Sequence, residues 1–251
     1  MEKKRVLARI DIKNKYVIKG VYLEGLRKIG NPMELCQRYA KEGIDEIVFM
    51  DAVAALYDRN SLIEIISEAS KNIFIPITIG GGIRTITDIQ NALDAGADKV
   101  AINTKAVKDP EFITEAVSTF GAQAIIGSIV ALQRESYWEV FIDNARTRTH
   151  IDAKKWSITL QDLGVGEIMV TSIDRDGTKK GYDTELMNEI NKSVSVPVIA
   201  SGGAGNKKDV IDLFIKVDCS AAAIASIFHY NLEKISGVKN EMALHGIEVR
   251  K

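Results

Sequence analysis

The stretch that decides the fold is Ile75-Pro76-Ile77-Thr78-Ile79-Gly80-Gly81-Gly82, because it returns 121 residues later as Val196-Pro197-Val198-Ile199-Ala200-Ser201-Gly202-Gly203. Each copy is an apolar β-rich run that ends in glycines and precedes a helix-like segment. A second pair of segments, Gly43–Ile47 and Gly164–Ile168, repeats at the same spacing. Coincidences at one offset indicate a duplicated structural unit. The sequence therefore predicts two similar halves, about 1–122 and 123–251.

Around these repeats, short β-rich runs alternate with helix-like segments. The runs are Arg5–Asp11, Glu46–Asp51, Pro76–Gly80, Lys99–Asn103, Ala124–Val130, Glu167–Ser172, Val196–Ser201 and Ala221–Ala225. The helix-like segments are Pro32–Glu42, Asn60–Lys71, Ile86–Ala95, Pro110–Phe120, Ala153–Leu163, Thr184–Ser193 and Lys207–Val217. Eight strands alternating with helices predict an α/β fold whose parallel sheet closes into a barrel. We expect one (β/α)₈ TIM barrel built from two homologous half-barrels that share a core.

Composition excludes several kinds of partner. The 251 residues are 46% hydrophobic and 27% charged, with a formal net charge of −1 and no polybasic run, so we expect no binding to nucleic acid or to a membrane surface. No apolar stretch reaches the ~20 residues of a membrane span, which favours a cytoplasmic protein. Cys36 and Cys219 lack metal-like spacing and are expected to be buried thiols, so no metal is predicted.

Both glycine clusters are candidates for phosphate binding. Each lies between a strand and a helix, where backbone N–H groups and the helix dipole favour an anion. The next strand of each half ends in small polar residues, Asn103-Thr104 in one and Ser226 in the other. The expected substrate- and phosphate-binding residues are Lys19, Asp51, Gly81, Gly82, Asn103, Thr104, Thr171, Ser201, Gly202, Gly203 and Ser226. The alternative is that the glycines only form tight turns.

Carboxylates at strand ends are the candidates for acid–base catalysis. Asp11 ends the first strand, and Asp176 follows the sixth. Active-site side chains of barrels lie at these carboxyl ends, although each carboxylate could instead cap a helix or pair with a neighbour. Lys19 is expected on a long loop after the first strand. The repeat places Val130 where the second half should mirror Asp11, so the expected second carboxylate is missing.

These motifs together resemble the cyclase subunit of imidazole glycerol phosphate synthase, over essentially the whole chain. The matching segments are Asp11–Lys13 with Val17–Gly20, Gly80–Ile83, Ala97–Val100 with Ile102–Thr104, Thr171–Lys179 and Ala200–Gly205. The resemblance implies a barrel that takes ammonia from a glutaminase subunit. It also implies conversion of a bisphosphate ribulosyl-formimino intermediate into imidazole glycerol phosphate and an aminoimidazole carboxamide ribotide. No cofactor is implied.

The resemblance also assigns residues to the amino-terminal face of the barrel. Its ammonia gate, a ring of charges, matches Arg5, Glu46, Lys99 and Glu167, each of which opens a strand. Buried charges are costly unless paired, so these two acids and two bases should pair with one another. The alternative is four ordinary surface charges. Asp98 and Gln123 resemble the family's contacts to the glutaminase.

Departures from the family's pattern cluster on the catalytic side. The family's two acid–base carboxylates match Asp11 and Val130, Arg9 replaces a small apolar residue, and Asn144-Ala145 replaces a glycine-containing turn. This pattern most resembles a specialised paralogue associated with amidating surface-polysaccharide sugars (acetamidino modification), in which ammonia passes to a separate sugar amidotransferase.

Three alternatives stay open at this point. One is a working cyclase of histidine biosynthesis that uses Asp11, with Asp176 or substrate phosphate, for proton transfer. Another is a single-chain sugar-phosphate isomerase, and the last is a non-catalytic scaffold that activates its glutaminase.

Overall fold

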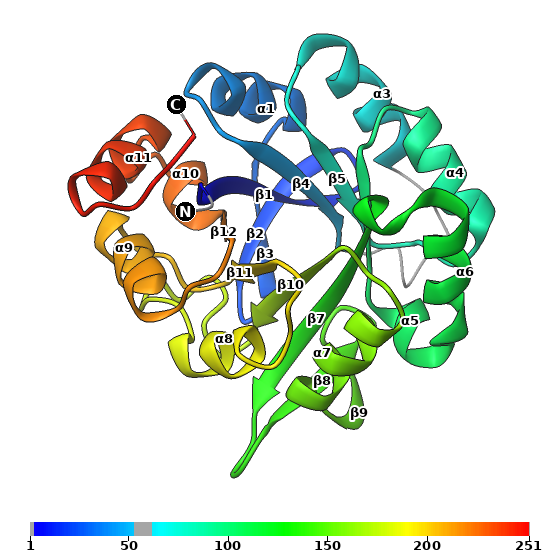
Figure 1. Cartoon of the computed structure of the whole chain (residues 1–251). Helices are drawn as coiled ribbons and strands as arrows, with labels where there is room; N and C mark the ends of the chain where they lie inside the picture. Colours follow the sequence, from blue (N-terminus) through cyan, green and yellow to red (C-terminus); the bar gives the residue numbers. More distant parts are fainter. Residues whose placement is uncertain (1–2, 53–61, 251) are drawn as a thin grey trace.

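The computed structural model describes residues 3–52 and 62–250 and contains a closed barrel of parallel strands surrounded by helices (Figure 1). The barrel strands follow one another around the ring, and pairing between β7 and β10 closes it. They are β1 (Arg5–Lys13), β4 (Glu46–Asp51), β5 (Ile77–Gly80), β6 (Lys99–Ile102), β7 (Ile125–Gln133), β10 (Glu167–Ser172), β11 (Val198–Ser201) and β12 (Ala221–Ile224). The predicted (β/α)₈ barrel is confirmed.

Helices cover the outside of the barrel, as Figure 1 shows. They are α1 (Pro32–Lys41), α3 (Leu62–Asn72), α4 (Ile86–Asp94), α6 (Glu111–Phe120), α7 (Ala153–Asp162), α8 (Thr184–Asn191), α9 (Lys207–Lys216) and α11 (Ile235–Leu244). Thr85 and Asn206 begin α4 and α9 with reciprocal capping boxes, which satisfy backbone N–H groups at those ends. The predicted helix start at Asn60 lies outside the described residues. No helix in the described ranges is long and apolar enough to cross a membrane.

Among the described residues, two antiparallel extensions, three short helical elements and the last helix, α11, were not predicted. β2 (Tyr16–Val21) and β3 (Glu24–Gly30) form a hairpin on β1, and β8 (Trp138–Ile142) and β9 (Thr147–Asp152) extend β7. The short elements are α5 (Thr104–Lys108), η1 (Ala122–Ala124) and α10 (Ser226–His229).

The first hairpin corrects the expected position of Lys19, which belongs to β2 and not to a loop. Its neighbour Ile18 lies opposite Asp11, and Asn14, at φ 57°, lies in the turn that reverses the chain. Asparagine tolerates this left-handed backbone better than most residues. The β-branched and aromatic run Tyr16-Val17-Ile18 was a strand signal that we missed.

The barrel interior is layered. At the amino-terminal end lie the charged residues that open β1, β4, β6 and β10, and above them lies an apolar layer. That layer comprises Leu7, Val48, Ala101, Ile126, Met169, Ile199, Ala221 and Ala223.

Strand register relates the two halves of the barrel. Leu7 lies opposite Glu46 in one half, and Ile126 lies opposite Glu167 in the other. Asp11 and Val130 are each four residues further along their strands, so they occupy matching positions. The common origin of the two halves stays a prediction.

Candidate active site

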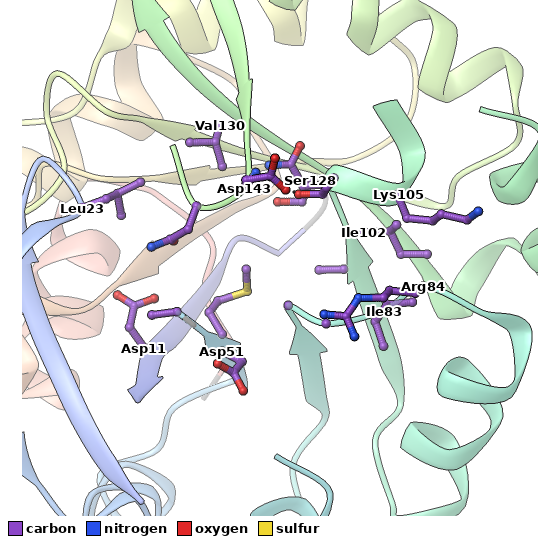
Figure 2. A pocket seen from close by; sticks show the side chains of 18 of the residues that line it. Asp11, Leu23, Asp51, Ile83, Arg84, Ile102, Lys105, Ser128, Val130 and Asp143 are labelled. Carbon is purple, nitrogen blue, oxygen red and sulfur yellow. Dashed lines mark hydrogen bonds between the residues drawn. The ribbon is translucent and has the colours of Figure 1, made fainter. Parts of the chain in front are cut away.

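A cavity opens at the carboxyl ends of the strands, where active sites of this fold lie. It has a volume of about 380 Å³ and is drawn in Figure 2. Of the predicted residues, the structure brings together Asp11, Asp51, Gly81, Gly82, Asn103, Thr104 and Val130, together with Arg9 and Asn144. The first glycine cluster is therefore part of the cavity wall.

Gly81 must be glycine for two reasons. Its φ of +88° is strained for other residues, and a Cβ there would lie 2.5 Å from the carbonyl oxygen of Asp51. The turn thus brings the Gly81 backbone close to the end of β4. A backbone without a side chain at this point lets an anion approach the N–H groups of the loop closely, as an anion-binding loop requires.

The second glycine cluster lines a much smaller cavity. Ser201, Gly202, Gly203 and Ser226 surround about 10 Å³, roughly the space of one water molecule. Lys19 and Arg9 also line this space, so cationic side chains occupy part of the volume that we expected to be open for phosphate. The loops after β5 and β6 and those after β11 and β12 lie on opposite sides of the ring, as the expected elongated ligand requires.

Asp11 is held between two cations. Its Oδ1 accepts a hydrogen bond of 2.9 Å from Nε of Arg9, and its Oδ2 lies 3.6 Å from Nζ of Lys19. Burial alone would raise the pKa of Asp11, but these two cations hold it below the ordinary value. Asp11 is therefore ionised at neutral pH, which suits a proton acceptor and not a proton donor.

Asp176, the other predicted catalytic carboxylate, is bound by Lys19. Its two oxygens lie 2.7 and 2.9 Å from the ammonium group, and both side chains are buried. Lys19 thus links Asp11 to Asp176 along the wall of the smaller cavity. In this arrangement Lys19 holds two carboxylates in place, a role that the sequence did not indicate.

Val130 belongs to an apolar cluster at the cavity wall. It is buried with Phe141 and Ile173, and Leu23 packs against them. Figure 2 shows Val130 and Asp11 on different walls of the cavity. The structure therefore agrees with the sequence in placing an apolar side chain, and no acid, at the position that matches Asp11.

Arg9 crosses the top of the apolar layer. Besides Asp11, its guanidinium donates 2.8 Å and 3.1 Å hydrogen bonds to the hydroxyls of Thr171 and Ser201. These two hydroxyls were predicted to contact substrate, and the structure shows them as acceptors for Arg9. Burial lowers the pKa of Arg9, but Asp11 and Asp176 more than offset this, so the side chain stays charged.

The four predicted gate residues form one paired ring at the opposite end of the barrel. Nη1 of Arg5 lies 2.7 Å from Glu46 and 3.1 Å from Glu167. Nζ of Lys99 lies 3.0 Å from Glu167 and 3.5 Å from Glu46. Each cation thus contacts both acids, which is the pairing that burial demands. The role of this ring in ammonia passage stays a prediction.

Asp98 and Gln123 are exposed on the same amino-terminal face as the ring. Asp98 precedes β6 and accepts a 2.8 Å hydrogen bond from the backbone N–H of Ile77, while Gln123 lies in η1 just before β7. Their positions leave both accessible to a docking protein.

His229 is a buried residue of the site region that the sequence did not single out. Its Nδ1 lies 2.6 Å from the hydroxyl of Tyr39. Burial, the largest effect, lowers its pKa from 6.5 to about 4; Asp11 opposes this, while Lys19 and Arg38 act in the same direction as burial. The imidazole is therefore neutral in the folded protein at neutral pH, beneath the Asp11–Lys19 pair.

This burial predicts a pH dependence of stability. Between pH 6.5 and 4 the unfolded chain binds a proton at His229 that the folded chain does not, so stability falls as pH is lowered. The loss should reach roughly 3 kcal/mol. Unfolding measured across this range should be less pH-dependent in His229→Gln, and unchanged in the exposed control His245→Gln. Equal slopes in wild type and His229→Gln would refute the assignment.

Several cavity residues were missed because the sequence gives them no distinctive context. They are Leu23, Arg84, Lys105, Lys108, Ser128 and Asp143. Leu23 comes from the unpredicted hairpin, and Asp143 from the unpredicted β8–β9 turn, where Asp143, Asn144 and Ala145 have positive φ values. Among the described residues, no group of three histidine, cysteine or acidic side chains could hold a metal ion.

Fold and site together define a class: a (β/α)₈ barrel enzyme with glycine loops and a charged cluster at one mouth. The family described as histidine biosynthesis protein matches residues 5–233. Imidazole glycerol phosphate synthase subunit HisF of Leuconostoc mesenteroides is 43% identical over 249 residues, and that of Bacillus cereus AH187 is 45% identical over 248. Each alignment covers 98% of both chains. The chain belongs to this histidine biosynthesis family and is an enzyme subunit of the HisF type.

The relatives also bear on the paralogue expectation. The protein of Natranaerobius thermophilus, 42% identical over 247 residues, carries the same HisF name. Nothing in these relatives supports the polysaccharide-modification branch that the sequence favoured. The alternative reading, a working cyclase subunit of histidine biosynthesis, fits them better.

Proposed function

We propose that this chain is the cyclase subunit of an imidazole glycerol phosphate synthase, working in the cytoplasm with a separate glutaminase subunit. Ammonia released by the glutaminase enters through the ring of Arg5, Glu46, Lys99 and Glu167. It crosses the apolar layer and reaches the bisphosphate intermediate at the mouth. The observation that carries the proposal is the stacking of these three layers on one axis, in a chain 42–45% identical to HisF subunits.

In the proposed reaction Asp11 is the general base. Its lowered pKa keeps it ionised, and it faces the cavity that contains the first glycine loop. One phosphate of the substrate binds at Gly81 and Gly82, and the other binds at Gly202 and Gly203. The second phosphate requires the side chains of Lys19 and Arg9 to move aside, because little space is open there. Both cations then remain close enough to neutralise it.

A second candidate rests on Val130. Without a second acid, the barrel could deliver ammonia to another acceptor, such as a sugar held by a separate amidotransferase. Loss of one general acid or base typically costs 10²–10⁴-fold in rate. The amino-terminal face with Asp98 and Gln123, together with the charged ring, would serve either function equally.

Turnover of the bisphosphate intermediate by the purified chain, with excess ammonium salt at high pH, separates these candidates. Free ammonia replaces the glutaminase, so the assay reports the barrel chemistry alone. We expect formation of imidazole glycerol phosphate. Binding of the intermediate without turnover would favour delivery to another acceptor. Absence of both would contradict the assignment of the mouth as a bisphosphate site.

A further inference from the structure

Just above the apolar layer, the barrel interior is lined by polar side chains. Two of their atoms have no role in the site as described so far. Four small polar side chains face the interior at this level: Asn103, Ser128, Thr171 and Ser201. Thr171 and Ser201 accept hydrogen bonds from Arg9. Within the described part of the chain, Oγ of Ser128 and Oδ1 of Asn103 are buried and have no hydrogen-bond partner.

These two atoms lie side by side at neighbouring strand positions. Ile102 ends β6 and lies opposite Gly127 on β7, so Asn103, the residue that follows β6, comes beside Ser128 on β7. Adjacent strands are about 4.8 Å apart. Both side chains line the 380 Å³ cavity, and Figure 2 shows Ser128 on its wall. The two atoms thus share one corner of the cavity floor.

Neither atom is left free by chance mobility of its side chain. Ser128 is only 1% exposed, and its Cβ lies in the middle of a barrel strand. The amide nitrogen of Asn103 donates a 3.1 Å hydrogen bond to the carbonyl oxygen of Phe141. This bond fixes the orientation of the amide and leaves Oδ1 as the atom available to a ligand. A buried polar atom without a partner typically costs 1–3 kcal/mol, so keeping two together implies a function.

We propose that Ser128 and Asn103 form a subsite for the carboxamide group of the ligand. The corner offers one acceptor, Oδ1 of Asn103, and one hydroxyl that can donate, Oγ of Ser128. A carboxamide complements both, since its NH₂ donates to Asn103 and its carbonyl oxygen accepts from Ser128. The corner carries no charge of its own, which suits a neutral group. This inference rests on the proposed function, whose product is an aminoimidazole carboxamide ribotide.

Ser128 is thereby a specificity-determining residue. Its partner position in the first half is Arg9, because Leu7 and Ile126 match in register and each residue lies two positions further along. At this depth in the barrel, the charged side chain of Arg9 lies on one wall, and the neutral hydrogen-bonding pair Ser128 and Asn103 lies on the other. A ligand that bridges the two walls is held in one orientation.

Calorimetric titration with two ribotides tests the subsite. Aminoimidazole carboxamide ribotide carries the group, and aminoimidazole ribotide lacks it. Wild type should bind the carboxamide ribotide more tightly, and Ser128→Ala should weaken its binding about tenfold while leaving the other ribotide unchanged. Ser157→Ala, a buried serine of α7 whose hydroxyl already bonds Lys154, is the matched control and should change neither.

The stability of the same variants gives an independent readout. Because the Ser128 hydroxyl has no hydrogen-bond partner among the described residues, Ser128→Ala should be at least as stable as wild type in thermal unfolding. A clear loss of stability would mean a structural role and overturn the proposal. Equal weakening of both ribotides would also overturn it, by placing the ribose at Ser128. If wild type binds neither ribotide, the proposed function is contradicted. If it binds both with equal affinity, only the carboxamide subsite is contradicted and the proposed function stands.

Discussion

Replacing Glu167 by alanine is expected to uncouple glutamine hydrolysis from ammonia use. Glutamine-dependent product formation by the complex should fall at least tenfold, while turnover with added ammonium stays near the wild-type rate. The reason lies in the pairing: Glu167 accepts from Lys99 at 3.0 Å and from Arg5 at 3.1 Å. Without it, two cations share Glu46 alone, and the ring rearranges or fills with water.

Product formed per glutamine hydrolysed is the measurement that checks this. Glu189→Ala is the matched control, because in the described part of the chain the Glu189 carboxylate pairs only with Lys154, at the surface. Loss of a partly buried pair will also lower stability, so the variant is assayed well below its unfolding temperature. Unchanged coupling in Glu167→Ala would show that ammonia does not enter through this ring.

The sequence was sufficient to predict the parts of the structure that depend on pattern. Alternation of strands and helices predicted the barrel. The paired ring was predicted from the resemblance to the cyclase family together with the cost of leaving buried charges unpaired. The internal repeat placed Val130 at the position that matches Asp11, and strand register agrees.

What the sequence could not predict depends on contacts between distant segments. Lys19 was expected on a long loop, but its strand in the first hairpin places it between Asp11 and Asp176. In the sequence, Arg9 was a charged residue at a position where an apolar side chain was expected. Its hydroxyl partners on β10 and β11 become visible only when the barrel is closed. His229 had no local signal at all, because its surroundings come from α1 and β1.

The departure at position 130 can be turned into an experiment. Val130→Asp should raise cyclase turnover with ammonium by roughly 10²-fold or more, within the range that one general acid or base contributes. The apolar neighbours Phe141, Ile173 and Leu23 would raise the pKa of a carboxyl group there, whereas Arg9 and Lys19 lower that of Asp11. Two carboxyls with pKa values pushed apart are the arrangement that supplies an acid and a base at one pH.

Val130→Asn is the matched control, because it has nearly the same shape and cannot titrate. Only Val130→Asp should gain turnover, and its pH–rate profile should acquire a second limb on the alkaline side, where the new acid deprotonates. Gain in both variants would mean that polarity, and not proton transfer, was missing. No gain in a folded Val130→Asp would shift the defect to Arg9, whose charge holds Asp11 in place, or to the turn at Asn144. The barrel would then be adapted to a different ammonia acceptor.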